Sequence, residues 1–339
     1  MLIVLQKKND QTLITHIQEL LQRKYDADSH IIGQNKRVIA VPGDTMNIDV
    51  ELLRSLEGVL SVDRVHRPYK LASRQQKDRT TIRLHDACTI GNREQCVVIA
   101  GPCSVESEGQ LDETAAYVHE QGVNILRGGA FKPRTGPYAF NGLGEKGLQM
   151  LRKTADKYGM SVDTEAMSVE QMDLVEEYAD IIQIGARNMQ NYDLLRRAGK
   201  AAKPVLLKRG LSSTLEEWLL AAEYILHEGN PNVILCERGI RTFEQEVRFT
   251  LCLGSIPALR ELTHLPIIVD PSHSAGKARW VDDCAKAAIA VGADGVIIET
   301  HPRPEEALSD GPQSLTEEQF ADCQKQMRVI ATAMGKKLV

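Results

Sequence analysis

The sequence lacks four features that would each assign it to a broad class of protein. No apolar run approaches the roughly 20 residues that a membrane-spanning helix needs. The net charge is −5 over 339 residues, so the chain has no general attraction for nucleic acid. The seven cysteines are scattered and form no Cys-x-x-Cys pair, as is typical of reduced thiols. The first residues, MLIVLQKKND, lack the basic start and the cleavage site of a secretion signal. We therefore expect a cytoplasmic protein that binds neither membranes nor nucleic acid.

The chain is longer than one ordinary domain and suits a barrel of about 250 residues with a small extra module. Residues 1–66 predict that module, because short apolar strands and amphipathic helices follow one another in the order β-α-β-β-α-β of a ferredoxin-like sandwich. The segments are LIVL, QTLITHIQELLQRKY, SHII, RVIAV, NIDVELLRSLE and VLSVDRV. The module contains no catalytic group, and by its fold alone we expect it to bind an effector or a second copy. Residues 67–96 predict a polar linker and a hairpin, TIRLHDACTIGNREQ.

Residues 97–339 alternate short apolar runs with helical patterns. Continuous apolar strands between helices indicate a parallel sheet that is covered on both faces. Eight such units predict a (β/α)8 (TIM) barrel, with an open doubly wound sheet as the alternative. The eight runs are VVIAG, NILRGG, MSVDTE, DIIQIG, PVLLKR, VILCER, PIIVDPS and GVIIET.

Polar or reactive residues follow all eight runs, at the end where a barrel of this kind carries its active site. One such residue at one strand end is usually a solvated loop residue. Eight strand ends in one ring instead predict a functional site. Many of these residues are cationic: Arg127, Lys132, Arg134, Arg187, Lys208 and Arg238, with Arg209 next in sequence.

So many cations at one mouth repel one another unless an anion balances them. Arginine forks match phosphate and carboxylate oxygens, so the set indicates two phosphates, or a phosphate and a carboxylate. The alternative is that ion pairs with Glu165, Glu237 and Asp270 absorb two or three of the cations.

A second set at the same mouth is Cys103, His273, Glu299 and Asp310. A thiolate, an imidazole and two carboxylates are plausible mixed ligands for a divalent metal. Asp270 is placed to orient His273 from behind the metal. Taken singly, Cys103 also suits a small buried thiol, and His273 an ordinary loop histidine.

Gly142, Gly144 and Gly147 match the dinucleotide-binding pattern G-x-G-x-x-G. That pattern needs a strand directly before the first glycine. Here the preceding apolar run ends near Gly128, so we expect these glycines to serve a long loop over the mouth.

Seven segments together closely resemble the 3-deoxy-D-arabino-heptulosonate 7-phosphate (DAHP) synthase family, type I beta. They are AGPCSVES, LRGGAFKPRT, IGARNMQN, LLKRG, LCERGIRTFE, VDPSHSAG and ALSDGPQSL. The resemblance covers the barrel, and the N-terminal module resembles the regulatory domain of that branch. It implies the condensation of phosphoenolpyruvate with erythrose 4-phosphate, the first step of the shikimate pathway.

The resemblance also implies a role for each residue. Cys103, His273, Glu299 and Asp310 match ligands of a divalent ion such as Mn2+. The phosphoenolpyruvate contacts would be Arg127, Lys132, Arg187, Lys208 and Arg238. The motif for erythrose 4-phosphate would be Lys132, Pro133, Arg134 and Thr135. It further implies a homotetramer and an aromatic amino acid effector near His30.

Two alternatives remain at this stage. The sister family, 3-deoxy-D-manno-octulosonate 8-phosphate synthase, shares the barrel but carries Ala-Asn-Arg-Ser after the lysine. This chain has Pro133-Arg134-Thr135 there, which favours the four-carbon sugar. The other alternative is a non-catalytic effector-binding protein, or a regulatory subunit of a partner enzyme, which the N-terminal module permits. The complete cationic and metal-ligand sets argue against it.

Overall fold

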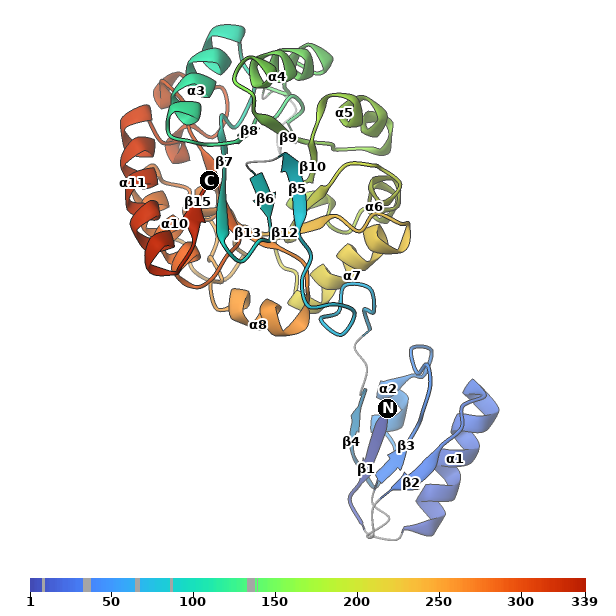
Figure 1. The fold of residues 1–339 in the computed structure, drawn as a ribbon. Helices are drawn as coiled ribbons and strands as arrows, with labels where there is room; N and C mark the ends of the chain where they lie inside the picture. Colours follow the sequence, from blue (N-terminus) through green and yellow to red (C-terminus); the bar gives the residue numbers. More distant parts are fainter. Residues whose placement is uncertain (8–9, 33–37, 65–67, 86–87, 133–137, 139) are drawn as a thin grey trace. The chain divides into compact units, whose positions relative to one another are not determined.

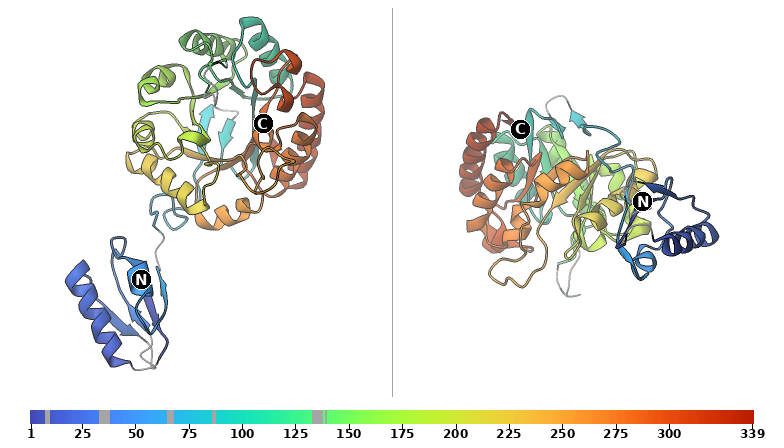
Figure 2. Two further views of the ribbon diagram at one scale, coloured as in Figure 1. Left: turned by 180° about the vertical axis from the view of Figure 1, so that it is seen from behind. Right: turned by 90° about the horizontal axis from the view of Figure 1, so that it is seen from below.

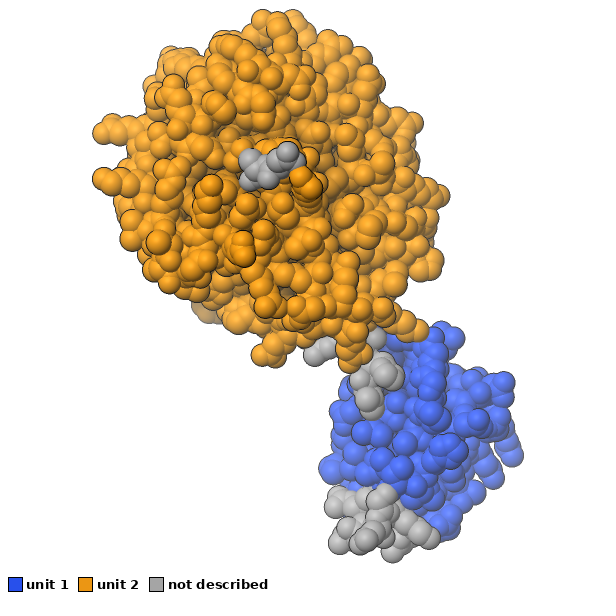
Figure 3. Space-filling model, in the orientation of Figure 1, with its two compact units in different colours: residues 1–68 blue, residues 69–339 orange. Residues whose placement is uncertain are grey.

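The chain divides into two compact units, residues 1–68 and residues 69–339, in the computed structural model (Figure 3). The structure describes all residues except 8–9, 33–37, 65–67, 86–87, 133–137 and 139. In the described part of the chain, no helix has the length and apolar character needed to cross a membrane.

The first unit is a four-stranded antiparallel sheet in the order β2-β3-β1-β4, with two helices. Helix α1 begins after Asp10, whose side chain accepts a hydrogen bond from Leu13 N, and it buries Ile14, Ile17 and Leu21. The element order confirms the predicted ferredoxin-like module. The elements are β1 (Leu2–Leu5), α1 (Gln11–Tyr25), β2 (His30–Ile32), β3 (Val38–Ala40), α2 (Val50–Arg54) and β4 (Val59–Asp63).

The second unit is a closed barrel of eight parallel strands (Figures 1 and 2). The last strand pairs with the first over Gly295–Glu299 and Val97–Gly101, so the predicted barrel is confirmed and the open sheet is wrong. The strands are β7 (Gln95–Gly101), β8 (Ile125–Arg127), β9 (Ser161–Glu165), β10 (Ile181–Ile184), β11 (Val205–Lys208), β12 (Val233–Glu237), β13 (Ile267–Val269) and β14 (Gly295–Glu299).

Helices surround the barrel, and at least one lies between each pair of consecutive barrel strands (Figure 1). Capping boxes fix the starts of two of them, Thr214 with Glu217 and Thr316 with Gln319. The helices are α3 (Glu108–Glu120), α4 (Glu145–Lys157), α5 (Met172–Tyr178), α6 (Tyr192–Gly199), α7 (Leu215–His227), α8 (Ser255–Leu262), α9 (Pro271–Ala275), α10 (Ala278–Ala290) and α11 (Glu317–Ala333).

A hairpin of β5 (Ile82–His85) and β6 (Cys88–Ile90) covers the amino-terminal end of the barrel. Its side chains Ile82, Cys88 and Ile90 are buried in one apolar cluster with side chains from the barrel interior. A short C-terminal strand, β15 (Lys337–Leu338), pairs with β7 and brings Val339 into the same cluster. This end of the barrel is therefore apolar and closed, and a site in the barrel has to open at the other end.

Candidate active site

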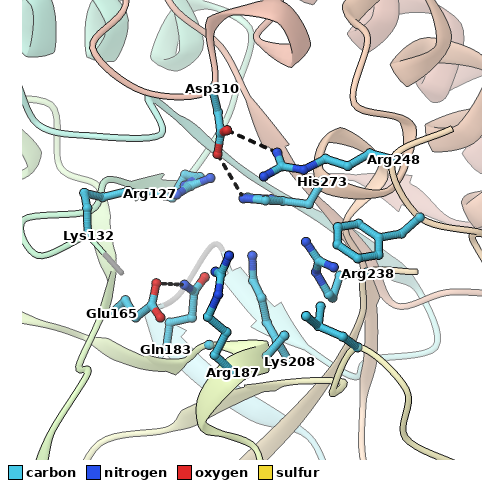
Figure 4. Close-up of a pocket in the computed structure, with 14 residues that line it drawn as sticks. Arg127, Lys132, Glu165, Gln183, Arg187, Lys208, Arg238, Arg248, His273 and Asp310 are labelled. Atoms are coloured by element: carbon cyan, nitrogen blue, oxygen red, sulfur yellow. Dashed lines mark hydrogen bonds and ion pairs between the residues drawn. The ribbon is translucent and has the colours of Figure 1, made fainter. Parts of the chain in front are cut away.

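A cavity opens at the carboxyl ends of the barrel strands (Figure 4). Cations outnumber carboxylates in its lining, which gives it a positive field suited to anionic ligands. Arg248 and Gln183 were not singled out by the sequence. The lining residues are Arg127, Lys132, Glu165, Gln183, Gly185, Ala186, Arg187, Lys208, Leu211, Arg238, Arg248, Phe249, His273 and Asp310.

The structure brings together all four residues of the predicted metal group. One donor atom from each of Cys103, His273, Glu299 and Asp310 lies within 4.8 Å of the others. His273 Nε2 is 3.4 Å from Glu299 Oε1 and 3.8 Å from Asp310 Oδ2. The Cys103 thiol lies 3.4 Å from the same Asp310 oxygen. Four mixed donors around one point are an arrangement that a divalent ion fits.

Asp270 orients the histidine of this group. Its carboxylate caps α9 by accepting from His273 N at 2.9 Å, and it also accepts from Nδ1 of the ring at 2.8 Å. Burial alone would raise the pKa of Asp270, but His273 and Lys208 hold it well below its usual range. Burial lowers the pKa of His273, which favours the neutral ring. The ring is therefore held with Nε2 free and turned toward the group, as a metal ligand requires.

Cys103 is buried, and burial raises the pKa of its thiol to about 12, with a further contribution from Glu299. Lys132 Nζ lies 3.1 Å from the sulfur and 2.9 Å from the Cys103 carbonyl oxygen. At neutral pH the isolated thiol therefore keeps its proton. A bound divalent ion would supply the positive charge that a thiolate needs, so the donor set fits such an ion.

Ion pairs account for some of the cations, as the alternative interpretation predicts. Lys208 Nζ is 2.6 Å from Asp270, and Arg209 is 2.7 Å from Glu237. Arg127 pairs at 2.6 Å with Glu299, a partner that the sequence did not indicate. The third predicted acid, Glu165, instead accepts a hydrogen bond from Gln183 at 3.2 Å.

Arg187 and Arg238 form no ion pair with any described carboxylate, and both point into the cavity (Figure 4). The guanidinium of Arg238 stacks 4.0 Å from the ring centroid of Phe249. Its Nη1 is buried and has no hydrogen-bond partner among the described residues. Burial lowers the pKa of Arg238, and the attraction of the Asp270 carboxylate offsets the loss of water only in part. Two cations are thus left available to an anionic ligand.

Comparison with known proteins agrees with this geometry. Residues 74–334 match the family model described as the DAHP synthetase I family, and residues 1–67 match the DAHP synthase ferredoxin-like domain. The chain belongs to the DAHP synthetase I family. The resemblance predicted from the seven sequence segments is therefore confirmed.

Two relatives show how far this family membership extends along the chain. The phospho-2-dehydro-3-deoxyheptonate aldolase of Thermotoga maritima is 52% identical over 340 residues, covering 100% of both chains. Its crystal structure covers 100% of this chain and 99% of its own, with a TM-score of 0.90 at 51% identity. A 2-dehydro-3-deoxyphosphooctonate aldolase of Bradyrhizobium is 34% identical over 254 residues, covering 68% of this chain and 86% of its own length. The full-length likeness is thus to the heptonate enzyme.

Not every predicted site residue is placed. Pro133, Arg134 and Thr135 of the erythrose 4-phosphate motif lie outside the described residues. Lys132 is described and buried at the cavity wall, where an added Cβ on Gly129 would come within 2.7 Å of its Cδ. His30 lies in the other compact unit, exposed at the start of β2.

The three glycines of the G-x-G-x-x-G match lie between β8 and α4 and in the first turn of α4. Gly142 and Gly144 precede the helix, and Gly147 lies within it. Strand β8 ends at Arg127 and α4 begins only at Glu145. Gly142 and Gly144 have positive φ, and an added Cβ on Gly142 would lie 2.1 Å from the Ala130 carbonyl oxygen. These glycines therefore let the loop fold back on itself, and they do not form a tight strand-turn-helix phosphate site.

Proposed function

We propose that this chain condenses phosphoenolpyruvate with erythrose 4-phosphate and water to give DAHP and inorganic phosphate. This is the first step of the shikimate pathway to the aromatic amino acids. One observation carries the proposal: a group of four metal-ligand types and two cations without acid partners face the same cavity. The full-length relative named as a heptonate aldolase supports the same reaction.

In this proposal, the cations position phosphoenolpyruvate. Its phosphate and its carboxylate are two anionic groups, which arginine guanidinium groups and lysine ammonium groups bind through charge-assisted hydrogen bonds. The binding set is Arg127, Lys132, Arg187, Lys208 and Arg238. Lys132, Pro133, Arg134 and Thr135 bind erythrose 4-phosphate, with Arg134 and Thr135 at its phosphate. Much of the rate then comes from holding two anions in register against preorganised charge.

Cys103, His273, Glu299 and Asp310 would hold a divalent ion, most simply Mn2+. Such an ion acts as a Lewis acid that polarises the aldehyde oxygen of the sugar. The protein's own part is to fix the ligands. Asp270 holds the His273 ring with Nε2 toward the group, and Lys132 neutralises charge beside the Cys103 sulfur.

The chemistry then needs no covalent enzyme intermediate. The enol carbon of phosphoenolpyruvate attacks the aldehyde carbon and forms the new carbon–carbon bond. Water adds at the carbon that bears the phosphate, and the bond between that carbon and the phosphate oxygen breaks. In this proposal, the buried cations Lys208 and Arg238 stabilise the phosphate as it leaves.

The decisive experiment measures phosphoenolpyruvate consumption by the metal-loaded protein with either erythrose 4-phosphate or arabinose 5-phosphate. We expect consumption with the four-carbon sugar, and loss of that activity with a chelator or in Cys103→Ala. Consumption only with the five-carbon sugar would assign the chain the reaction of the octonate relatives. No consumption with either sugar would favour the non-catalytic regulatory role.

We further propose that the N-terminal unit is regulatory, with residues 1–66 binding an aromatic amino acid near His30 in a homotetramer. The match of residues 1–67 to the ferredoxin-like domain of this family supports that role. Equilibrium dialysis with tyrosine and phenylalanine tests it, with His30→Ala as the comparison. Binding of neither amino acid by the wild-type chain would exclude the effector.

A further inference from the structure

Arg248 contacts the proposed metal group from a loop, whereas most of the other charged residues at the site lie at or directly after the ends of barrel strands. It lies in the long loop between β12 and α8, and its guanidinium points toward Asp310 (Figure 4). Its Nη1 donates to Asp310 Oδ1 at 3.1 Å and to the side-chain oxygen of Gln313 at 2.6 Å. One guanidinium thus holds two side chains of the loop that follows β14.

Gln313 carries this connection to the second carboxylate of the group. Its side chain is buried, and its amide Nε2 donates a hydrogen bond to Glu299 Oε2. Because its side-chain oxygen is fixed by Arg248, the amide nitrogen faces Glu299. Arg248 therefore contacts Asp310 directly and Glu299 through Gln313.

In this arrangement, the two oxygens of each carboxylate have different partners. Oδ1 of Asp310 is taken by Arg248, while Oδ2 faces the Cys103 sulfur at 3.4 Å and His273. In the same way, Oε2 of Glu299 is taken by Gln313, while Oε1 faces His273 Nε2 at 3.4 Å and also accepts a hydrogen bond from Arg127 at 2.6 Å. In both residues, the oxygen that faces the group is the one left free of Arg248 and Gln313.

The backbone is shaped to hold Arg248 in this place. An added Cβ on Gly276 would lie 2.6 Å from the Cβ of Arg248, so the glycine makes room for its stem. The next residue, Phe249, donates its N–H to the Ser274 carbonyl oxygen at 2.9 Å. The loop that bears Arg248 is thereby fastened to the segment that bears His273.

We propose that Arg248 and Gln313 are a positioning pair that sets the affinity of the metal site by fixing the orientation of Asp310 and Glu299. The inference rests on the metal site of the proposed function. It concerns metal binding rather than the identity of the sugar. Partners of this kind, hydrogen-bonded to ligating carboxylates, typically change metal affinity by 10- to 100-fold.

The direction in which Mn2+ affinity changes when Arg248 is replaced distinguishes a positioning role from a purely electrostatic one. A positive guanidinium beside a cation repels it, so an Arg248 that acts only by charge weakens metal binding, and its removal would strengthen it. A positioning Arg248 does the opposite. We expect Arg248→Met and Gln313→Leu each to weaken Mn2+ binding by about tenfold, as followed by competition with a fluorescent chelator without substrates.

Arg241→Met is the matched control, because it removes an exposed positive charge from the same loop. Its Mn2+ affinity should equal that of the wild-type chain. The double variant Arg248→Met/Gln313→Leu should bind Mn2+ little more weakly than Arg248→Met, because loss of Arg248 already releases both Asp310 and Gln313. Circular dichroism confirms that each variant is folded before its affinity is compared.

Kinetics at saturating Mn2+ provide the second readout. A positioning role predicts that the Arg248→Met activity recovers at high metal with the KM values for both substrates unchanged. Unchanged or tighter Mn2+ binding in Arg248→Met would overturn the inference, as would a raised substrate KM at saturating metal. A wild-type chain that binds Mn2+ but does not condense the sugar would refute the proposed reaction and leave this inference standing. A wild-type chain that binds no Mn2+ would overturn both the metal site and the inference.

Discussion

The two ends of the barrel interior differ in polarity, although the same eight strands form both: the amino-terminal end is apolar and the carboxyl-terminal end carries charged side chains. Within one strand, an apolar side chain is followed two positions later by a charged one. Examples are Ile125 and Arg127 in β8, and Leu206 and Lys208 in β11. Strand β14 passes in the same way from Ile297 to Glu299. Side chains two residues apart share a face of a strand, so one step of the pleat separates the closed end from the open end.

This difference separates stability from function within one core. The end beneath the hairpin is packed with isoleucine, valine, leucine and cysteine. The open end buries arginines, lysines and carboxylates that can be compensated only by one another or by a ligand. Burial of apolar side chains at the closed end thus offsets the free-energy cost of burying charged groups at the open end.

The largest effect should come from breaking a buried ion pair at the open end. Arg209 pairs with Glu237, and both side chains are buried. Arg209→Met leaves the Glu237 carboxylate without its charged partner, so we expect the free energy of unfolding to fall by about 3–5 kcal/mol. Chemical denaturation measures this. A loss below about 1 kcal/mol would mean that water or another group compensates Glu237.

The neighbouring Arg238 should behave in the opposite way. It has no described carboxylate as an ion-pair partner, so Arg238→Met removes a buried charge without leaving another one unpaired. We expect a stability equal to or above that of the wild-type chain, and a KM for phosphoenolpyruvate raised by about 10- to 100-fold. Steady-state kinetics and thermal unfolding test both statements, and a destabilised variant with normal KM would contradict them.

Within the apolar cluster at the closed end, packing should decide the effect of a substitution. Ile90 of the hairpin is fully buried, so Ile90→Ala should lower the free energy of unfolding by about 3 kcal/mol with kcat unchanged. Leu84 is only partly buried in the same hairpin, and Leu84→Ala is the matched control with a smaller loss. A fall in the kcat of folded Ile90→Ala would show that the two ends are not independent.

The pH dependence of metal binding distinguishes a ligand thiol from a merely buried one. The pKa of Cys103 in the metal-free chain is raised to about 12 by burial, so binding through sulfur must release its proton. Between about pH 6.5 and 8.5, Mn2+ affinity should then rise by about tenfold per pH unit, because His273 is already neutral. Cys103→Ser should flatten this slope, and a flat slope in the wild-type chain would exclude the thiolate ligand.

The dependence of stability on pH should involve Asp163, which lies in β9 two residues before Glu165. Burial raises its pKa to about 7, and its Oδ1 has no hydrogen-bond partner among the described residues. The folded chain therefore keeps a proton that the unfolded chain loses between about pH 4 and 7, so stability falls as pH rises through that range. Asp163→Asn should lack this fall and should be more stable than the wild-type chain at pH 8. Parallel stability curves against pH would contradict it.

The strands and the contents of the open end could be predicted from the sequence, because buried parallel strands are continuous apolar runs and barrel sites follow them directly. Cys103, His273 and Glu299 were found in this way. Arg248 could not be found, because it lies far along a loop after β12 where no strand end points to it. The partner of Arg127 was also missed, since pairing across the barrel with Glu299 depends on which strands close the sheet.

The order of the elements along the chain has a consequence for synthesis. The hairpin that closes the barrel is made before any barrel strand, yet its buried side chains pack with residues as distant as Ile297 and Val339. During translation, Ile82 and Ile90 therefore remain without most of their final neighbours until nearly the whole chain is complete. Contacts so far apart in sequence form slowly, and an apolar segment that waits for them is open to wrong partners. The element that closes the barrel is thus a point at which a growing chain is exposed to aggregation.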